Sequence, residues 1–219
     1  MKIFLDFDDV TFNAKKFKRD LIGVFFKNGV SREEFDNSYY FITRKVVGRK
    51  DYYDPQKQIL VLRRRESINQ KKLKKDLDNF MKDLSGYVFR DFYAFLKLFR
   101  KSDLYLITFG HPKFQAKKIN RSGIGKYFKK VVISRKDKID DIMRIMKEDK
   151  FPDSEEVVFV EDYPEQVEEA KRKSKRLRCF HMCRPEGRYS NLACEYKDFE
   201  VTNLRETLKI VKKLAVEKS

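Results

Sequence analysis

The sequence predicts an α/β fold: a Rossmann-like parallel sheet core with helices on both faces, interrupted by an inserted α-helical subdomain. Two observations predict the core. Short apolar runs bounded by polar residues recur along the chain, as in strands that helices cover on both faces, and segments of helical periodicity separate these runs. A third observation predicts the insert, because about 75 residues of helical pattern without a strand pair follow the first apolar run.

Four apolar runs predict buried strands, and a fifth run is weaker. Each contains β-branched, aromatic or leucine side chains and is flanked by charged or polar residues, as expected for parallel strands inside a sheet. The four are Lys2–Phe7, Leu104–Ile107, Val131–Ile133 and Val157–Val160, and the weaker fifth is Arg178–Cys183.

Helical spacing of apolar residues fills the segments between these strands. In the core it predicts helices over Tyr87–Lys101, Phe114–Asn120 and Ile139–Lys147. Within Phe12–Gly86 it predicts further helices, with Asp51–Pro55 as an internal loop. We therefore expect residues 1–12 and 86–219 to form the α/β core and residues 13–85 to form the insert.

Composition restricts the class of protein. The 219 residues include 51 Lys and Arg against 34 Asp and Glu, a formal net charge of +17, and 14% aromatic residues, too many for a disordered chain. No apolar run is long enough to span a membrane, and no signal peptide is expected, because Asp6 interrupts the first apolar run. Three cysteines, an odd number, fit a reducing compartment, so we expect a cytoplasmic protein without a membrane partner.

The positive charge is unevenly distributed. Residues 11–90 carry 20 Lys and Arg against 10 Asp and Glu, which is 10 of the 17 excess charges. A surface of this sign favours anions, including phosphorylated metabolites and nucleic acids, over cationic partners.

Polar residues follow each predicted strand, at the edge of the sheet where ligands bind in open α/β folds. Carboxylates follow two strands, a hydroxyl follows another and lysines follow a fourth. The residues are Asp6 and Asp8, Thr108, Lys136 and Lys138, and Glu161 and Asp162.

This set suits phosphoryl transfer. A carboxylate can attack phosphorus and form an aspartyl-phosphate. Carboxylates from two strands can hold Mg²⁺, which prefers oxygen ligands, and the metal and a lysine would neutralise the transferring group. Alternation along an extended segment places Asp6 and Asp8 on one side, so the second carboxylate could protonate the leaving oxygen.

The order and spacing of these motifs resemble the haloacid dehalogenase-like superfamily, in the branch whose helical cap is inserted after the first motif. The resemblance is carried by Asp6-Phe7-Asp8-Asp9-Val10, a strand ending in Thr108, a lysine 24 residues before Asp162, and Glu161-Asp162 after the fourth strand. It extends through Gln115 and residues 123–134.

The resemblance implies a role for each matching residue. Asp6 would be the nucleophile and a Mg²⁺ ligand, and Asp8 the general acid and base, with its carbonyl also on the metal. Thr108 and Lys138 would hold the phosphoryl oxygens. Asp162 would bind Mg²⁺, with Glu161 beside it in direct or indirect contact, and Lys136 is the alternative to Lys138. Glu161 and Gln166 depart from the commoner residues of the family at these positions.

The resemblance implies a Mg²⁺-dependent phosphomonoester hydrolase acting on a small phosphorylated metabolite. Two alternatives stay open. A nucleic-acid-associated protein, either a polynucleotide-end phosphatase or a non-catalytic binder, is suggested by the net charge of +17, although no nucleic-acid-binding motif supports it. A sugar-phosphate mutase of the same superfamily would differ only in the acceptor of the phosphoryl group. The sequence does not predict the oligomeric state.

Overall fold

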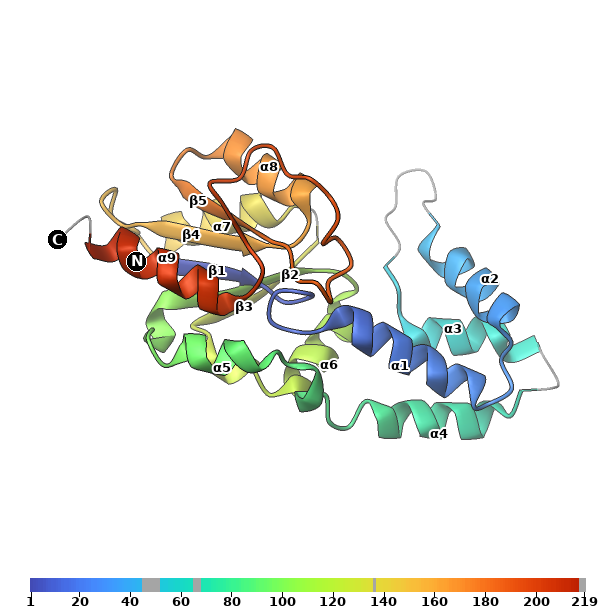
Figure 1. The fold of residues 1–219 in the computed structure, drawn as a ribbon. Helices are drawn as coiled ribbons and strands as arrows, with labels where there is room; N and C mark the ends of the chain where they lie inside the picture. Colours follow the sequence, from blue (N-terminus) through green and yellow to red (C-terminus); the bar gives the residue numbers. More distant parts are fainter. Residues whose placement is uncertain (45–51, 65–67, 136, 217–219) are drawn as a thin grey trace.

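The computed structural model describes residues 1–44, 52–64, 68–135 and 137–216 (Figure 1). These residues form one six-stranded parallel sheet in the order β3-β2-β1-β4-β5-β6. This order reverses direction next to β1, and ligands of open α/β sheets bind at such a point. The strands are β1 (Lys2–Asp6), β2 (Leu104–Phe109), β3 (Lys130–Ser134), β4 (Val157–Glu161), β5 (Leu177–Met182) and β6 (Phe199–Val201).

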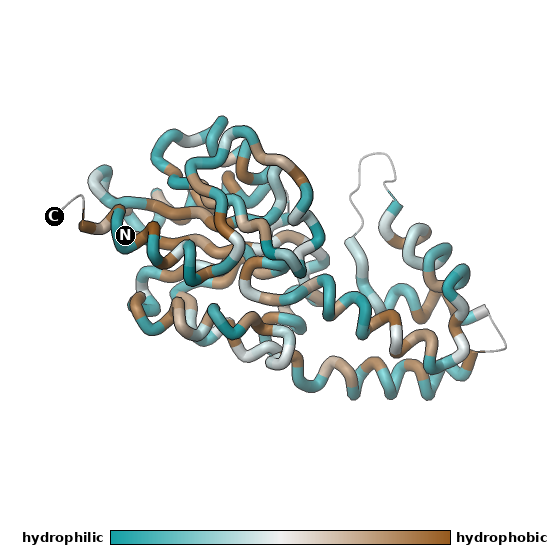
Figure 2. The backbone as a smooth tube through the Cα atoms, in the orientation of Figure 1, coloured by the Kyte–Doolittle hydropathy of each residue, from teal (hydrophilic) through white to brown (hydrophobic). Residues whose placement is uncertain are grey.

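Helices cover both faces of the sheet because the strands are apolar on both faces. Ile3 and Leu5 pack into one apolar cluster and Phe4 into another, as the alternation of side chains along a strand requires. Figure 2 shows the resulting apolar band along the central strands. The first cluster includes residues of α5 (Arg90–Leu96), α6 (Pro112–Ser122) and α9 (Leu204–Val216), and the second includes residues of α7 (Lys138–Glu148) and α8 (Pro164–Lys173).

The predicted α/β class is confirmed, and three details of the prediction are wrong. The strand at Val131–Ile133 is not buried, because β3 lies at the edge of the sheet and Val131 is 39% exposed. The three-residue β6 was not predicted. The helix expected over Tyr87–Lys101 is limited to α5, because Val88 is extended and bridges Phe12 in antiparallel fashion.

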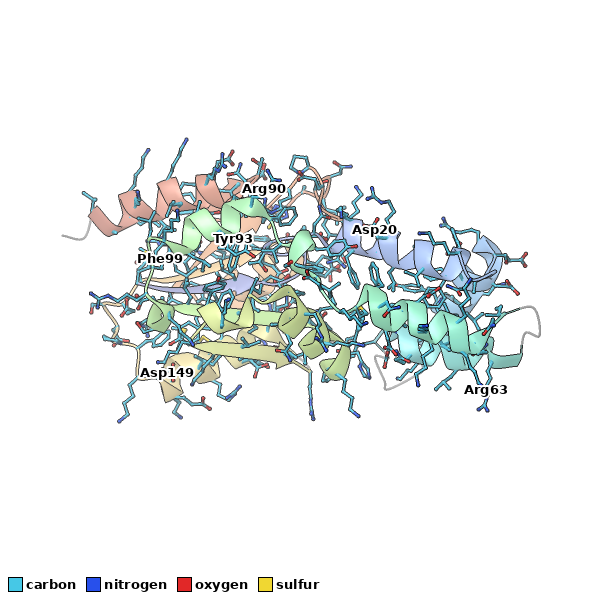
Figure 3. All side chains as sticks on the ribbon, turned by 90° about the horizontal axis from the view of Figure 1, so that it is seen from below. Asp20, Arg63, Arg90, Tyr93, Phe99 and Asp149 are labelled. Atoms are coloured by element: carbon cyan, nitrogen blue, oxygen red, sulfur yellow. The ribbon has the colours of Figure 1, made fainter. Side chains whose placement is uncertain are left out.

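The insert consists of helices grouped to one side of the sheet, the side toward which β1 leads (Figure 1). Side-chain caps stabilise the N-termini of the first two helices. The Asn13 side chain accepts from the amide of Lys16, and Ser31 and Glu34 form a reciprocal capping box. Arg63 lies near the end of the insert that is farthest from the core, whereas Asp149 lies in the core, well away from the insert (Figure 3). The helices are α1 (Ala14–Phe26), α2 (Arg32–Thr43), α3 (Pro55–Val61) and α4 (Gln70–Phe80).

The predicted loop at Asp51–Pro55 falls partly outside the described residues. Asp51 is not among them, whereas Tyr52–Asp54 lie outside regular structure and Pro55 opens α3, after the Asp54 cap. The limits of the insert as a separate domain, residues 13–85, stay a prediction.

The chain enters and leaves the insert through two segments that lie side by side. The amide of Asn13 donates to the carbonyl of Tyr87 at 2.8 Å, and the amide of Phe89 donates to the carbonyl of Thr11 at 3.0 Å. The Tyr87 hydroxyl also donates to Asp20 of α1 at 3.0 Å, and Figure 3 labels Asp20 on this helix. These bonds fix the start of α1 relative to the loop after β1. Within the described ranges, no helix has the length and apolar character needed to cross a bilayer.

Candidate active site

The loop after β1 carries two of the predicted site residues. Asp6 is the last residue of β1 and is 2% exposed. The chain then turns sharply, because the amides of Thr11 and Phe12 both donate to the carbonyl of Phe7. Asp9 sits in this turn in the left-handed region, with φ 57°, and its carboxylate accepts from the amide of Ala14 at 2.9 Å. This bond joins the turn to the first residue of α1.

Three buried carboxylates meet at the point where the strand order reverses. Asp6 ends β1, and Glu161 and Asp162 follow one another at the end of the adjacent β4. One oxygen from each lies within 4.8 Å of the others. The imidazole of His181, on the neighbouring β5, is 3.2 Å from the carbonyl of Asp162, so its Nε2 carries the hydrogen and donates to that carbonyl.

Lys138 lies between two of these carboxylates. It is the first residue of α7, which Asp137 caps by accepting from the amide of Ile139. The Lys138 ammonium donates to Asp6 and to Glu161, each at 2.6 Å. Burial disfavours its charge, but the two carboxylates outweigh burial and raise the pKa of Lys138 above its usual value. Lys138 is therefore a permanent cation in this site.

One lysine does not neutralise three buried carboxylates. Burial raises the pKa of Asp6 to about 8, with Glu161 and Asp8 adding to the rise and Lys138 opposing it. Burial, followed by the charges of Glu161 and Asp6, also raises the pKa of Asp162 well above its ordinary value. A further positive charge beside the cluster would therefore stabilise the ionised forms of these carboxylates.

Asp8 is held by two side chains of α6. The Lys118 ammonium donates to one carboxylate oxygen at 2.5 Å, and the Gln115 amide donates to the other at 3.0 Å. The same amide donates to the Thr108 hydroxyl at 2.9 Å. Gly110 permits this approach, because a Cβ there would lie 2.9 Å from the Gln115 side chain and its φ is 149°. Thr108, at the end of β2, is thus joined to Asp8 through Gln115.

The charges around Asp8 keep it ionised. Burial alone would raise its pKa, but Lys118 and Arg188 together with the hydrogen bonds from Lys118 and Gln115 lower it below the ordinary value. Lys118 is itself 4% exposed, and burial lowers its pKa in spite of Asp8. Asp6 and Asp8 therefore have pKa values displaced in opposite directions.

Arg188 is a site residue that the sequence does not reveal. It follows β5 in an irregular segment, its guanidinium binds the carboxylate of Asp9, and its charge acts on Asp8 and Asp162. No periodicity or motif sets it apart from the other arginines. Gln115 and Lys118 carried a weak signal, since their spacing of three places both on one face of a predicted helix.

The structure brings the predicted site residues together. A hollow of about 420 Å³ is lined by six of them: Asp6, Asp8, Thr108, Lys138, Glu161 and Asp162. Arg188, Tyr189 and Gln166 also line it. Lys136 lies outside the described residues. Both carboxylate oxygens of Glu161 are engaged, one by Lys138 and one by the amide of Tyr163 at 3.2 Å.

Comparison with known proteins supports this arrangement at the level of the fold. No family model matches the chain, and no curated protein matches its sequence. Solved structures do match. A protein described as a haloacid dehalogenase-like hydrolase from Burkholderia xenovorans has 17% identity and a TM-score of 0.71, over 94% of this chain and 97% of its own.

Two further structures share the fold. An L-2-haloacid dehalogenase from Xanthobacter autotrophicus has 14% identity and a TM-score of 0.61, over 96% of this chain and 98% of its own. A hydrolase from Bacillus subtilis, described as bound to magnesium with interdomain movement, has 13% identity and a TM-score of 0.61, over 96% of this chain and 97% of its own. This chain has the haloacid dehalogenase-like fold.

Haloacid dehalogenase-like hydrolases generally use Mg²⁺, and the residues present here fit such an ion. Asp162 has a buried carboxylate oxygen, Oδ2, without a hydrogen-bond partner in the described part of the chain. It faces a cluster of oxygen donors, which a hard cation prefers to sulfur or nitrogen. Asp6 and Asp162 would hold the ion directly. Glu161 is the exception, because its oxygens bind Lys138 and a backbone amide.

Proposed function

We propose that this protein is a Mg²⁺-dependent phosphomonoester hydrolase in which Asp6 is the nucleophile. The observation that carries the proposal is the pair of carboxylates on one loop. Asp6 faces the acidic cluster and Lys138, whereas Asp8 is held by Lys118 and Gln115. Because both carboxylates line the same hollow, one can attack phosphorus while the other transfers a proton. A cation bound beside Asp6 would favour its ionised form, which the attack requires.

The chain's own residues supply the steps of the reaction. An oxygen of Asp6 attacks phosphorus, and the bond from phosphorus to the leaving oxygen breaks. The proton shared by Lys118 and Asp8 passes to that oxygen, so the alcohol leaves neutral. Asp8 then takes a proton from water, which attacks the acyl phosphate, releases inorganic phosphate and restores Asp6.

Other residues orient the phosphoryl group. The Thr108 hydroxyl and the Lys138 ammonium line the same hollow as Asp6 and can donate to phosphoryl oxygens. Glu161 fixes Lys138 by accepting from it at 2.6 Å. Mg²⁺, held by Asp6 and Asp162, would neutralise the negative charge that otherwise repels a phosphate from these carboxylates.

Asp8 favours phosphate ester hydrolysis over dehalogenation. A halide leaves as a stable anion and needs no proton, whereas an alkoxide needs one. Asp8, on the same loop as the nucleophile, is paired with the buried Lys118 ammonium at 2.5 Å, and this pair can supply that proton. A mutase would use the same residues with a sugar hydroxyl in place of water, and no feature of this site favours that acceptor.

We also propose a cytoplasmic location and a role for the helical insert as a cap over the site. All three cysteines of the chain are described and free, as in a reducing compartment. The insert carries the larger share of the net positive charge and lies at the carboxyl ends of the strands. A cap in that position would attract an anionic substrate and exclude water on closing.

The test is phosphate release from a panel of phosphorylated metabolites, with Mg²⁺ and with EDTA. Asp6→Asn is expected to lower turnover by a factor of about 10⁴ or more while the circular dichroism spectrum stays unchanged. Asp153→Asn, at a fully exposed position of the core, is the matched control and should retain wild-type turnover. Wild-type turnover by Asp6→Asn, or turnover unaffected by EDTA, would contradict the proposal.

A further inference from the structure

A second hollow adjoins the acidic site. It has a volume of about 170 Å³ and shares Asp8, Phe109 and Arg188 with the first. Residues of α1, α2 and the segment before α3 line it from the insert, and residues of β2 and α6 line it from the core. A group leaving from phosphorus near Asp8 would therefore have this hollow directly beside it.

Seven of the sixteen residues that line this hollow are Phe or Tyr. They come from both sides of the hollow and meet edge to face: Tyr52 against Phe109 at 4.9 Å and 88°, and Tyr53 against Phe114 at 5.9 Å and 83°. The Tyr53 hydroxyl donates to Gln58 at 2.6 Å, so its polar atom is satisfied. Phe17, Phe35 and Tyr39 complete the aromatic lining.

The volume suits one ring. A protein cavity of about 150 Å³ with apolar walls holds a benzene molecule, and this hollow is slightly larger at about 170 Å³. Aromatic walls favour a planar ring over a puckered or open-chain group of similar size, because ring pairs gain stabilisation beyond the area that they bury.

The wall also contains polar groups, and one of them is buried without a hydrogen bond. The buried Nδ1 of His111 makes no hydrogen bond to any described residue and lies 3.8 Å from the carboxylate of Asp54. Lys118 and Gln115 also line the hollow, but both are bound to Asp8. The hollow therefore offers apolar contact, a hydrogen-bonding group at His111 for a substituent on the ring, and the cationic side chains of Lys18 and Arg188.

We infer that this hollow binds the leaving group of the substrate, and that the substrates are phosphomonoesters carrying a single aromatic ring next to the phosphate, such as aryl and arylmethyl phosphates. The inference rests on the proposed function. The products are inorganic phosphate and a phenol or an arylmethanol, which receives the proton from the Asp8–Lys118 pair as the phosphorus–oxygen bond breaks.

The decisive comparison separates ring recognition from leaving-group chemistry. Benzyl, cyclohexylmethyl and propyl phosphate all release primary alcohols, so differences in kcat/KM report mainly on the hollow. We expect benzyl phosphate to exceed propyl phosphate by about 10- to 100-fold, as burial of one ring predicts, and to exceed cyclohexylmethyl phosphate as well. Equal values for the three esters would overturn the inference.

A matched pair of variants on α2 tests the wall. Tyr39 lines the hollow, whereas its neighbour Tyr40 is 71% exposed. Tyr39→Ala should lower the ratio of benzyl to propyl kcat/KM by about tenfold, and Tyr40→Ala should leave the ratio unchanged. An unchanged ratio in a folded Tyr39→Ala protein would contradict the inference.

Binding of phosphonates, which are not hydrolysed, distinguishes failure of this inference from failure of the proposed function. Calorimetry on the wild-type protein with Mg²⁺ should show tighter binding of benzylphosphonate than of propylphosphonate. If no phosphate ester is hydrolysed but this preference holds, the proposed reaction is wrong and the ring site stands. If esters are hydrolysed without a preference in either assay, the ring site is wrong and the reaction stands.

Discussion

Lys138 joins two carboxylates that come from different strands. Because its ammonium is buried and bonded to Asp6 and Glu161, its removal leaves two buried carboxyl groups close together without the cation that they share. Breaking a buried ion pair by removing one partner costs about 3–5 kcal/mol. Lys138 is thus expected to stabilise the fold, in addition to the phosphate binding proposed for it.

We predict that Lys138→Met lowers the free energy of unfolding by about 3–5 kcal/mol in EDTA. Mg²⁺ should restore part of this loss, because the ion neutralises the same carboxylates. Urea unfolding with and without Mg²⁺ measures both effects. Lys147→Met, at an exposed position of the same helix, is the control. Equal stability of the two variants in EDTA would refute the role given to Lys138.

Asp162 provides a test of the metal. Its buried Oδ2 has no partner among the residues described, so bound Mg²⁺ should stabilise the folded protein. At a concentration 100 times Kd the ion contributes about 2.7 kcal/mol, which raises Tm by about 5–10 °C. Asp162→Asn should remove most of this rise, as followed by differential scanning calorimetry. A rise of the same size in the variant would show that Mg²⁺ binds elsewhere.

The location of a site residue could be predicted from the sequence where the residue lies at the end of a strand. Asp6, Thr108 and Asp162 stand at or just beyond strand ends, and parallel strands bring such positions to one edge. Arg188 could not be predicted in this way. It reaches the site from an irregular segment, where no repeat relates position in the sequence to position in space.

Helix α7 illustrates how one element ties several others together. At its end the carboxylate of Asp149 accepts from the Tyr105 hydroxyl at 2.8 Å and from Lys130 at 2.6 Å, and it pairs with Lys129 at 2.8 Å. These partners belong to β2 and to the start of β3. Burial opposes the charge of Asp149, but the three donors lower its pKa well below the ordinary value.

We predict that Asp149→Asn lowers the free energy of unfolding by about 1–2 kcal/mol near pH 7, a modest effect because the two lysines are partly exposed. A carboxylate with a lowered pKa stabilises the fold above its unfolded pKa of about 4, and this contribution is lost as the pH falls through the folded value. The difference between wild type and variant should therefore shrink below about pH 4. Urea unfolding at several pH values measures it, and a difference that grows with acidity would contradict the assignment.

Elements were predictable where the pattern was long or fully apolar. Strands β1, β2 and β4 are buried on both faces, and strands in such an environment have a continuous apolar sequence that predicts them. The shortening of α5 could not be predicted, because it results from a bridge between Phe12 and Val88, two residues far apart in the chain.

The whole molecule combines a large positive charge with an acidic site. The net charge is +17, whereas the hollow at the sheet edge contains five carboxylates among its lining residues. The surface can therefore draw an anion toward this site, where Lys138, Arg188 and the proposed Mg²⁺ would offset the negative charge of the carboxylates. Attraction of this kind acts over about 10 Å at 0.1 M salt and weakens as the salt concentration rises.

We predict that raising NaCl from about 20 to about 200 mM lowers kcat/KM for a phosphomonoester several-fold, with little change in kcat. Lys72→Glu with Lys75→Glu, both exposed on α4 of the insert, should reduce this salt dependence. Lys212→Glu with Lys213→Glu on α9 is the control pair, because α9 packs on the core away from the insert (Figure 1). Identical salt dependence in both double variants would show that the charge of the insert does not guide the substrate. Salt-sensitive retention on heparin without Mg²⁺-dependent turnover would favour the nucleic-acid alternative instead.

The two outermost strands have a consequence for self-association. An edge strand can pair with a strand from another molecule and so begin aggregation. Here β6 has three residues, and β3 begins at Lys130, directly after Lys129. Short length at one margin and adjacent lysines at the other are the features that block such pairing. Edge-to-edge pairing between copies of this chain is therefore disfavoured at both margins of the sheet.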